Sequence, residues 1–196
     1  SLCSTIINMA QDFTGSNNMN LLEPSGQFGT RLLGGKDPAS PRYIFTRLKP
    51  DTSVLFPEHH NILLTYLKED GMDIEPMYYL PTLPLVLING SKGIGTGFST
   101  DIPCFNPEDI KKNIKNLIEG KPLDPMTPWY QGFKGSIEKI SENKWMSYGI
   151  VDKVNTNTVR ITELPLFKWT EDFKKYLDKL ETDKKIDTYT NNSDTE

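Results

Sequence analysis

The feature that most constrains the fold is the stretch from Tyr78 to Gly97, where an apolar run leads into four glycines. Pro81 and Pro84 interrupt the apolar part, and a proline neither donates a backbone hydrogen bond nor continues a regular helix. The glycines follow within Asn89–Gly97, a density that predicts a tight loop. We therefore expect a strand or edge segment that runs into this loop and marks a boundary in the chain.

The same loop matches no nucleotide-binding template. A phosphate-binding loop needs Lys and then Ser or Thr after its second glycine, and a dinucleotide fingerprint starting at Gly93 would need glycine at Phe98. The loop also holds Ile94, a large apolar residue between two glycines. Two interpretations of Ile94 stay open: it packs back into the core, or it is an apolar wedge that enters a base step and kinks a duplex.

Helical periodicity is clearest near the start and in the middle of the chain. Apolar residues recur at helical spacing from Leu2 to Phe13, and the Gly-rich Asn20–Gly35 indicates short strands and an exposed loop, so this part suggests a winged-helix unit. Pro107–Glu119 is predicted as a helix that Asn106 caps and Gly120 ends. The buried face predicted for this helix consists of Ile110, Ile114, Leu117 and Ile118.

The last third of the chain alternates between apolar and polar residues as strands do. The predicted strands are Gly135–Ile140, Tyr148–Val154 and Thr158–Leu164. Thr170 is expected to cap a helix that turns Phe173, Tyr176, Leu177 and Leu180 inward. Composition alone predicts a disordered tail over Glu181–Glu196, which is rich in Lys, Asp, Thr and Asn.

The net charge of -4 and the pI near 5.3 argue against a dedicated nucleic-acid binder. The charge is uneven, however, because residues 1–49 hold five basic and three acidic side chains, a net +2, which leaves -6 for the rest. A polyanion is expected to meet this first part. An acidic protein-interaction domain also fits the overall charge, but it predicts no salt-dependent affinity for DNA.

No metal site is predicted. Four carboxylates lie close together in the sequence and could bind magnesium: Glu69, Asp70, Asp73 and Glu75. A solvated turn explains them equally well, with Gly71 among them at the end of a helix. Cys3 and Cys104 lie far apart with no CxxC spacing, and His59 and His60 are expected on a surface loop, so neither zinc nor a disulfide is indicated. A reducing intracellular compartment fits best. The uncapped helical pattern at the first residues suggests a chain cut from a larger protein.

Tyr43, in Pro41-Arg42-Tyr43-Ile44-Phe45, has an ordinary interpretation as a core or strand aromatic. It is also a possible nucleophile, because a tyrosine hydroxyl can attack a phosphodiester when a base or a cationic field assists it. Arg42 could supply that charge. Neighbours in an extended strand point to opposite faces, so the two side chains share one phosphate only if the backbone bends after Pro41.

Several stretches, in the right order, resemble the breakage-reunion region of eukaryotic-type topoisomerase II and, more distantly, the corresponding subunit of bacterial DNA gyrase. They are TIINMAQDFTGSNNMNLLEPSGQFGTR from Thr5, GGKDPASPRYIFT from Gly34, LPLVLINGSKGIGTGFS from Leu83 and ITELP from Ile161. The resemblance spans essentially the whole chain, including its last residues. PRYIF together with LINGxxGIGTG is a highly specific pair.

This resemblance implies an α+β fold with a winged-helix DNA-binding domain over residues 1–98 and a truncated α/β tower domain over residues 99–196. It implies that Tyr43 forms a 5'-phosphotyrosyl bond, that Arg42 stabilises the transition state and that Ile94 is the intercalating wedge. It also implies order rather than disorder for the C-terminal segment. Further DNA contacts implied by it are Ser1, Ser16, Asn17, Asn18, Gln27, Thr30 and Lys36.

The implied activity is that of an ATP-dependent topoisomerase II, a homodimer in the nucleus or at a viral DNA replication site. Mg²⁺ and ATP would both bind outside this chain, in the rest of the polypeptide, and the isolated piece is expected to be inactive. The alternative is a non-catalytic DNA-bending winged-helix module in which Tyr43 only packs. Cellular eukaryotic members tend to carry an acidic residue where this chain has Lys92, a Glu where it has Met77 and a Trp where it has Phe98. These differences suggest a divergent member from a protist or a large DNA virus.

Overall fold

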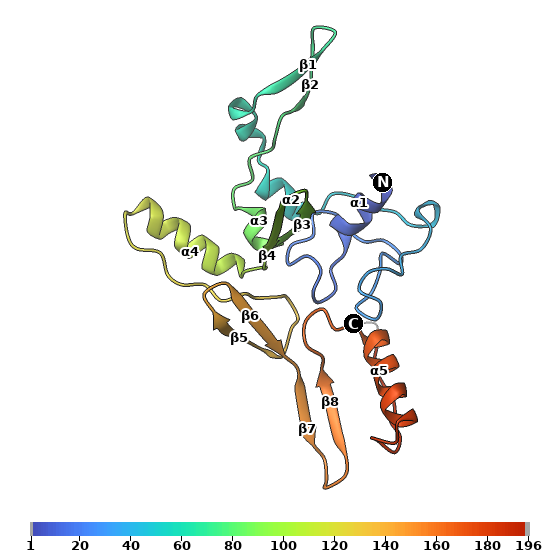
Figure 1. The fold of residues 1–196 in the computed structure, drawn as a ribbon. Helices are drawn as coiled ribbons and strands as arrows, with labels where there is room; N and C mark the ends of the chain where they lie inside the picture. Colours follow the sequence, from blue (N-terminus) through green and yellow to red (C-terminus); the bar gives the residue numbers. More distant parts are fainter. Residues whose placement is uncertain (1, 195–196) are drawn as a thin grey trace.

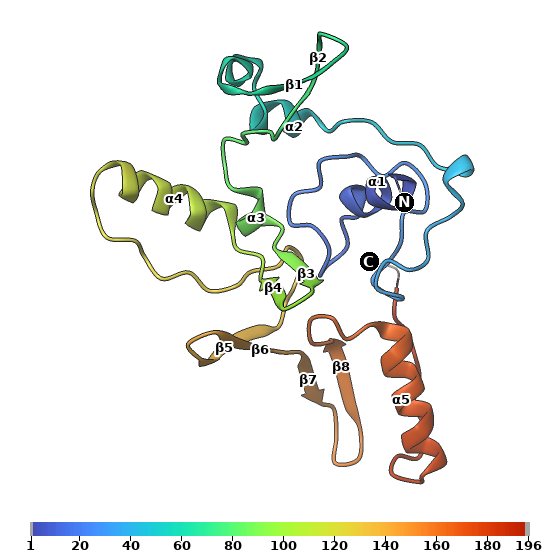
Figure 2. The same ribbon diagram turned by 45° about the horizontal axis from the view of Figure 1, so that its top comes forward.

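A computed structural model describes residues 2–194, in which helices and two-stranded hairpins project from a small centre (Figures 1 and 2). The helices are α1 (Leu2–Ala10), α2 (Pro50–Leu55), α3 (Leu85–Ile88), α4 (Pro107–Ile118) and α5 (Thr170–Thr182), with 3-10 turns at Pro41–Tyr43 and Glu58–Leu63. The strands are β1 (Tyr66–Glu69), β2 (Met72–Pro76), β3 (Ser91–Gly95), β4 (Phe98–Ile102), β5 (Ser136–Ser141), β6 (Lys144–Tyr148), β7 (Ile150–Lys153) and β8 (Val159–Glu163). No helix among these residues is long and apolar enough to cross a membrane.

The strands form four separate antiparallel pairs, β1-β2, β3-β4, β5-β6 and β7-β8. This mixture of helices and antiparallel strands agrees with the expected α+β class. The short strands expected within Asn20–Gly35 are absent from the described structure, where single bridges join Leu22 to Leu48 and Ser25 to Phe45 instead. β6 and the β1-β2 hairpin were not predicted.

The first helix is shorter than its apolar pattern predicted. It ends at Ala10, and the Asn17 amide Nδ2 then donates to the carbonyls of Asn8 (2.7 Å) and Gln11 (2.8 Å), which satisfies the open end of the helix. Ile7 and Ala10 pack with Phe28 in the main apolar cluster. Leu2 and Met9, expected on the buried face, are 72% and 38% exposed.

The exposed surface is too large for a self-contained globule. The chain exposes 14246 Å², whereas a compact monomer of 22.3 kDa exposes roughly 9,400 Å². Large apolar side chains account for part of the excess, including Ile62 at 87% and Ile118 at 79%. These surfaces indicate contact with protein or ligand outside this chain.

Helix α4 confirms its predicted cap but not its predicted face. The Asn106 side chain accepts from Glu108 N at 2.9 Å, Pro107 occupies the first turn, and Gly120 follows with φ +68°. Ile110 is buried and Ile114 is half-buried, whereas Leu117 and Ile118 are exposed. The second half of α4 projects beyond the body of the molecule (Figure 1), so nothing in the described part of the chain covers those two residues.

The acidic group around Gly71 lies in a hairpin turn, not at a helix end. Asp70 and Gly71 both have positive φ, +50° and +80°, and they connect β1 to β2 in a hairpin that projects from the body (Figure 1). Its carboxylates face solvent. Residues 2–194 contain no group of three or more His, Cys, Asp or Glu side chains placed to hold a metal ion.

The C-terminal segment from Glu181, expected from composition to be disordered, is helical only to Thr182, and residues 183–194 follow as turns and irregular chain. Helix α5 ends at Thr182, and the Tyr189 hydroxyl beyond it donates to Asp178, which brings the following residues back along the helix. Composition does not reveal this contact, because it reports the polarity of a segment and not the partners of its side chains. Trp169, rather than the predicted Thr170, is the N-cap residue of α5, and Phe173, Leu177 and Leu180 are only half-buried while Tyr176 is 50% exposed.

Candidate active site

Tyr43 and Arg42 lie together on an exposed turn. Pro41–Tyr43 forms a single 3-10 turn in which Tyr43 N donates to Ser40 O at 2.9 Å. In this bend the side chains of Arg42 and Tyr43 do not point to opposite faces as they would in an extended strand. The guanidinium carbon of Arg42 therefore lies 4.9 Å from the centre of the Tyr43 ring. Tyr43 is 66% exposed, so its interpretation as a core aromatic is wrong.

The turn is anchored on both sides by backbone hydrogen bonds. Ala39 N donates to Gln27 O at 2.9 Å before the turn, and Ser25 and Phe45 exchange bonds of 3.1 and 3.0 Å after it. Behind the turn lies an apolar pocket of about 170 Å³, lined by Cys3, Ile6, Ile7, Phe28, Pro41, Ile44, Phe45 and Thr46. A tyrosine and an arginine are thus presented to solvent on a braced loop.

Three of the other candidate residues make side-chain hydrogen bonds to residues more than five positions away in the chain. Thr30 is buried, and its N and Oγ1 donate to the Asp37 carboxylate at 2.9 and 2.6 Å. Asn18 is also buried, and its amide donates to Trp129 O at 2.9 Å while accepting from Gln131 N at 2.9 Å. Asn17 bonds the end of α1, as described above. Their side chains hold the loops of the first part of the chain in place.

The remaining candidates differ in how far they reach solvent. Gln27 and Lys36 are exposed, and Ser16 is half-buried with its hydroxyl donating to Phe13 O at 2.5 Å. Ser1 lies outside the described residues. Exposed cationic and amide groups such as Lys36 and Gln27 suit contacts with a phosphate backbone.

Ile94 lies near the tip of the β3-β4 hairpin and is 90% exposed. The interpretation that it packs into the core is therefore wrong. Its exposed face also carries Lys92, whose Nζ lies 3.8 Å from the Asp101 carboxylate on β4. The strand or edge segment expected over Tyr78–Ile88 is wrong, because this segment contains no strand and ends in the short helix α3 (Leu85–Ile88). The loop expected over Asn89–Gly97 is mostly strand β3 and the turn of the β3-β4 hairpin.

Sequence reasoning missed the contacts that join the first part of the chain to the last. Arg31 donates to the Glu163 carboxylate and, at 3.1 Å, to Leu164 O, and Glu171 N donates to Leu32 O at 3.1 Å. Trp169 packs edge-on against Phe13, with ring centres 5.9 Å apart. The sequence shows Arg31 and Glu163 only as two charged residues among many, so it could not identify them as a pair.

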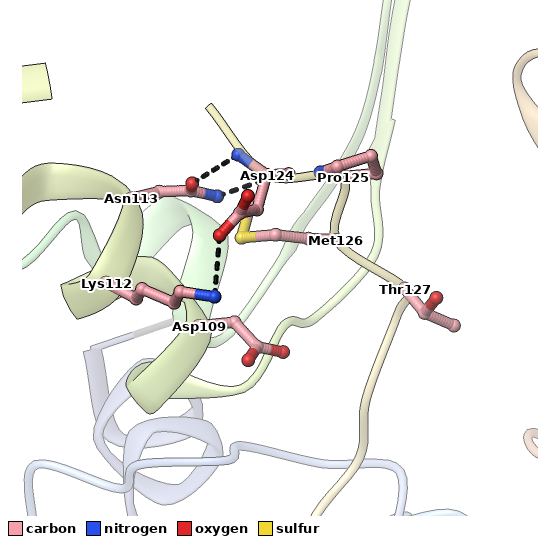
Figure 3. Close-up of a pocket in the computed structure, with 7 residues that line it drawn as sticks. All are labelled: Asp109, Lys112, Asn113, Asp124, Pro125, Met126 and Thr127. Atoms are coloured by element: carbon pink, nitrogen blue, oxygen red, sulfur yellow. Dashed lines mark hydrogen bonds and ion pairs between the residues drawn. The ribbon is translucent and has the colours of Figure 1, made fainter. Parts of the chain in front are cut away.

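A polar pocket of about 210 Å³ lies beside α4, away from the Tyr43 turn, and Figure 3 shows its lining residues. Lys112 pairs with Asp124 at 2.7 Å, which lowers the pKa of the Asp124 carboxyl and raises the pKa of the Lys112 amine. Asn113 exchanges two hydrogen bonds with the Asp124 backbone, of 2.9 and 2.7 Å. These bonds hold the segment after α4 against the helix.

Comparisons with known proteins place the whole chain in a family. A family model that describes the A subunit of DNA gyrase/topoisomerase IV matches residues 1–196. The chain therefore belongs to this DNA gyrase/topoisomerase IV family. Within it, the similar curated proteins are eukaryotic type II topoisomerases, and this chain corresponds to part of their breakage-reunion region.

The relatives are close over this chain but much longer. DNA topoisomerase 2 of Arabidopsis thaliana is 54% identical, over 93% of this chain and 13% of that protein. DNA topoisomerase 2 of Plasmodium falciparum is 52% identical, over 94% of this chain and 13% of that protein. The crystal structure of the Plasmodium falciparum topoisomerase II DNA-binding, cleavage and re-ligation domain superposes with a TM-score of 0.94 and 51% identity, covering 98% of this chain and 27% of that one.

Proposed function

We propose that this chain is the strand-cleaving part of an ATP-dependent type II DNA topoisomerase, with Tyr43 as its nucleophile. The observation that carries the proposal is the 66% exposed Tyr43 with the Arg42 guanidinium 4.9 Å from its ring. The turn that presents both side chains is braced on each side by backbone hydrogen bonds. The family to which the chain belongs supplies the substrate, duplex DNA.

In the proposed reaction the Tyr43 hydroxyl oxygen attacks the scissile phosphorus and its proton leaves to a base. The bond from phosphorus to the 3' oxygen breaks, the 3' oxygen takes up a proton, and the 5' phosphate stays on Tyr43 as a phosphodiester. Arg42, a planar cation beside the ring, stabilises the charge that builds on the phosphate oxygens. Attack by the 3' hydroxyl reverses each step and reseals the strand.

Magnesium would supply charge neutralisation at the scissile phosphate. As the resemblance implies, the proposal has Mg²⁺ and ATP bind outside this chain, and no step is derived through either; in residues 2–194 no three His, Cys, Asp or Glu side chains are placed to hold a metal ion. The chain spans 13% of the Arabidopsis relative, which leaves ample sequence in such a protein for those sites.

The finer architecture belongs to the same proposal. Residues 1–98 would form a winged-helix domain and residues 99–196 part of a tower domain, with Ile94 as the wedge that bends the duplex. Two copies would act together, because a double-strand break needs one tyrosine for each strand, while a second duplex passes through the gap. We expect the enzyme to work in the nucleus or at a viral DNA replication site. The exposed end of α4, at Leu117 and Ile118, supports a need for further protein around this chain.

The test uses the full-length protein with supercoiled DNA and magnesium, and traps covalent adducts with detergent. Wild type should leave protein on 5' ends, and Tyr43→Phe should leave none because it lacks only the attacking oxygen. Tyr78→Phe is the matched control, since Tyr78 is 54% exposed but lies far along the chain from the turn. Adducts that persist in Tyr43→Phe would show that another residue is the nucleophile.

A non-catalytic DNA-bending module is the second candidate, because the 90% exposed Ile94 needs no chemistry to kink a duplex. It predicts bending without adducts in the wild-type protein. Arg42→Lys separates the two further: it keeps the charge but loses the planar contact, and under the cleavage proposal it lowers the rate by about 10²-fold. Under the bending proposal this variant bends DNA as wild type does.

A further inference from the structure

The four glycines around the β3-β4 hairpin fall into two kinds. Gly90 and Gly97 have φ of +70° and +80°, and a Cβ on Gly90 would lie 2.6 Å from Ile102 O. The fold therefore requires glycine at both positions. Gly93 and Gly95 have no such φ; a Cβ at Gly93 would meet nothing within 4 Å, and one at Gly95 would meet only Phe98 O at 3.8 Å. Nothing in the described structure requires glycine at these two positions.

Strand register places Gly93 and Gly95 on one face with Phe98. Ile94 pairs with Ser99 and Lys92 with Asp101, whereas Gly95 pairs with Phe98 and Gly93 with Thr100. Because paired residues share a face and neighbours alternate, the hairpin has a wedge face with Ile94 and a glycine face, which we define as Gly93, Gly95 and Phe98. Phe98 is 85% exposed on that second face.

We propose that the glycine face is a second DNA-contact surface, which seats the sugar-phosphate backbone of one wall of the minor groove while Ile94 enters the base step. This inference rests on the proposed function. A strip without side chains lets another backbone approach closely, and Phe98 beside it offers an apolar ring for a deoxyribose.

The shape and charge of the hairpin fit this occupant. An apolar wedge that enters a base step from the minor groove kinks the duplex toward the major groove, so when Ile94 on the wedge face is inserted, the opposite face of the hairpin tip lies next to a groove wall. The glycine face and its neighbour Thr100 carry no charge, while the carboxylate of Asp101 lies on the other face beside Lys92. A phosphate backbone approaching the glycine face therefore meets no carboxylate of the hairpin.

The test compares Gly95→Ala and Phe98→Ala in the full-length protein, with Met72→Ala, at a 68% exposed residue of β2, as the control for loss of an exposed apolar side chain elsewhere. Three quantities are measured: the Tm, the Kd for a short duplex by fluorescence anisotropy, and bending by energy transfer between dyes at the duplex ends. We expect Gly95→Ala to keep or raise the Tm, since its Cβ makes no close contact in the free protein. Both glycine-face variants should raise the Kd about fivefold or more and reduce bending, whereas Met72→Ala should change neither.

Two results would overturn the inference. Unchanged Kd and bending in both variants would show that DNA does not use this face, and a lowered Tm for Gly95→Ala would show that the fold itself needs the glycine. Neither result touches the proposed function, which the loss of adducts in Tyr43→Phe reports separately. A wild-type protein that neither binds nor bends DNA would refute both.

Discussion

The buried pair of Arg31 and Glu163 should be the most sensitive contact between the two ends of the chain. The Glu163 side chain is 4% exposed and the Arg31 side chain 16%, and the carboxylate accepts otherwise from Lys134 N at 3.3 Å. Arg31→Met leaves this carboxylate buried with a single backbone donor. Stranding a buried charge in this way costs about 3–5 kcal/mol.

Hydrogen exchange in the full-length protein measures this cost locally. We expect peptides that span Arg31 and Glu163 to exchange about 10²- to 4 × 10³-fold faster in Arg31→Met, since about 1.4 kcal/mol corresponds to a factor of ten when exchange follows local opening. The double variant Arg31→Met with Glu163→Gln removes both charges and keeps an oxygen for Lys134 N. It should recover most of the loss.

The reasoning would be refuted by additivity. If Arg31→Met and Glu163→Gln each accelerate exchange slightly and the double variant shows their sum, the two side chains are not coupled and the pair does not join these segments. Peptides from the β1-β2 hairpin, which lies on the opposite side of the molecule from β8 in Figure 1, serve as the internal reference for unchanged exchange.

Four further outcomes are expected. Gly34→Ala should destabilise the protein by about 2–5 kcal/mol in denaturant unfolding, because its φ is +63° and its Cβ would lie 2.3 Å from the Trp169 ring; an unchanged midpoint would contradict this packing. Burial raises the pKa of the Cys104 thiol to about 11, so at pH 8 about one thiol in a thousand is ionised; mass spectrometry should find iodoacetamide on exposed Cys3 long before Cys104. The same shift in the pKa predicts stability that is lost as the pH rises from about 9 towards 11, since the unfolded thiol ionises first. Asn106→Ala should cost about 1 kcal/mol, seen as faster exchange in the first turn of α4, and equal exchange would show that the cap is dispensable.

Local signals in the sequence predicted local structure well. Asn106, Pro107 and Gly120 predicted the bounds of α4 because capping depends on residues within one turn. The bend at Pro41–Tyr43 is also present, because proline fixes its own φ and favours the start of a turn. Tyr43 and Arg42 can contact one phosphate only if this bend exists. These features need no knowledge of distant parts of the chain.

The features that depend on distant partners were not predictable. Leu117 and Ile118 have the periodicity of a buried face, but periodicity says which residues favour burial and not whether a partner is present to cover them. The β1-β2 hairpin escaped notice because its strands carry charges on exposed faces, and no residue of β1 or β2 is buried. Thr30 was expected to contact DNA by resemblance, and its bond to Asp37 is a tertiary fact that composition does not carry. Its role in DNA binding stays a prediction.

The division of the strands into four isolated pairs has a consequence for biosynthesis. Each of the eight strands in residues 2–194 leaves one hydrogen-bonding edge without a neighbouring strand, and such edges readily pair with other chains. Hairpins of this kind are also marginal without packing around them. When this region leaves the ribosome before its coverings exist, it should be a client of holdase chaperones, and the yield of the whole protein should depend on how quickly those edges are shielded.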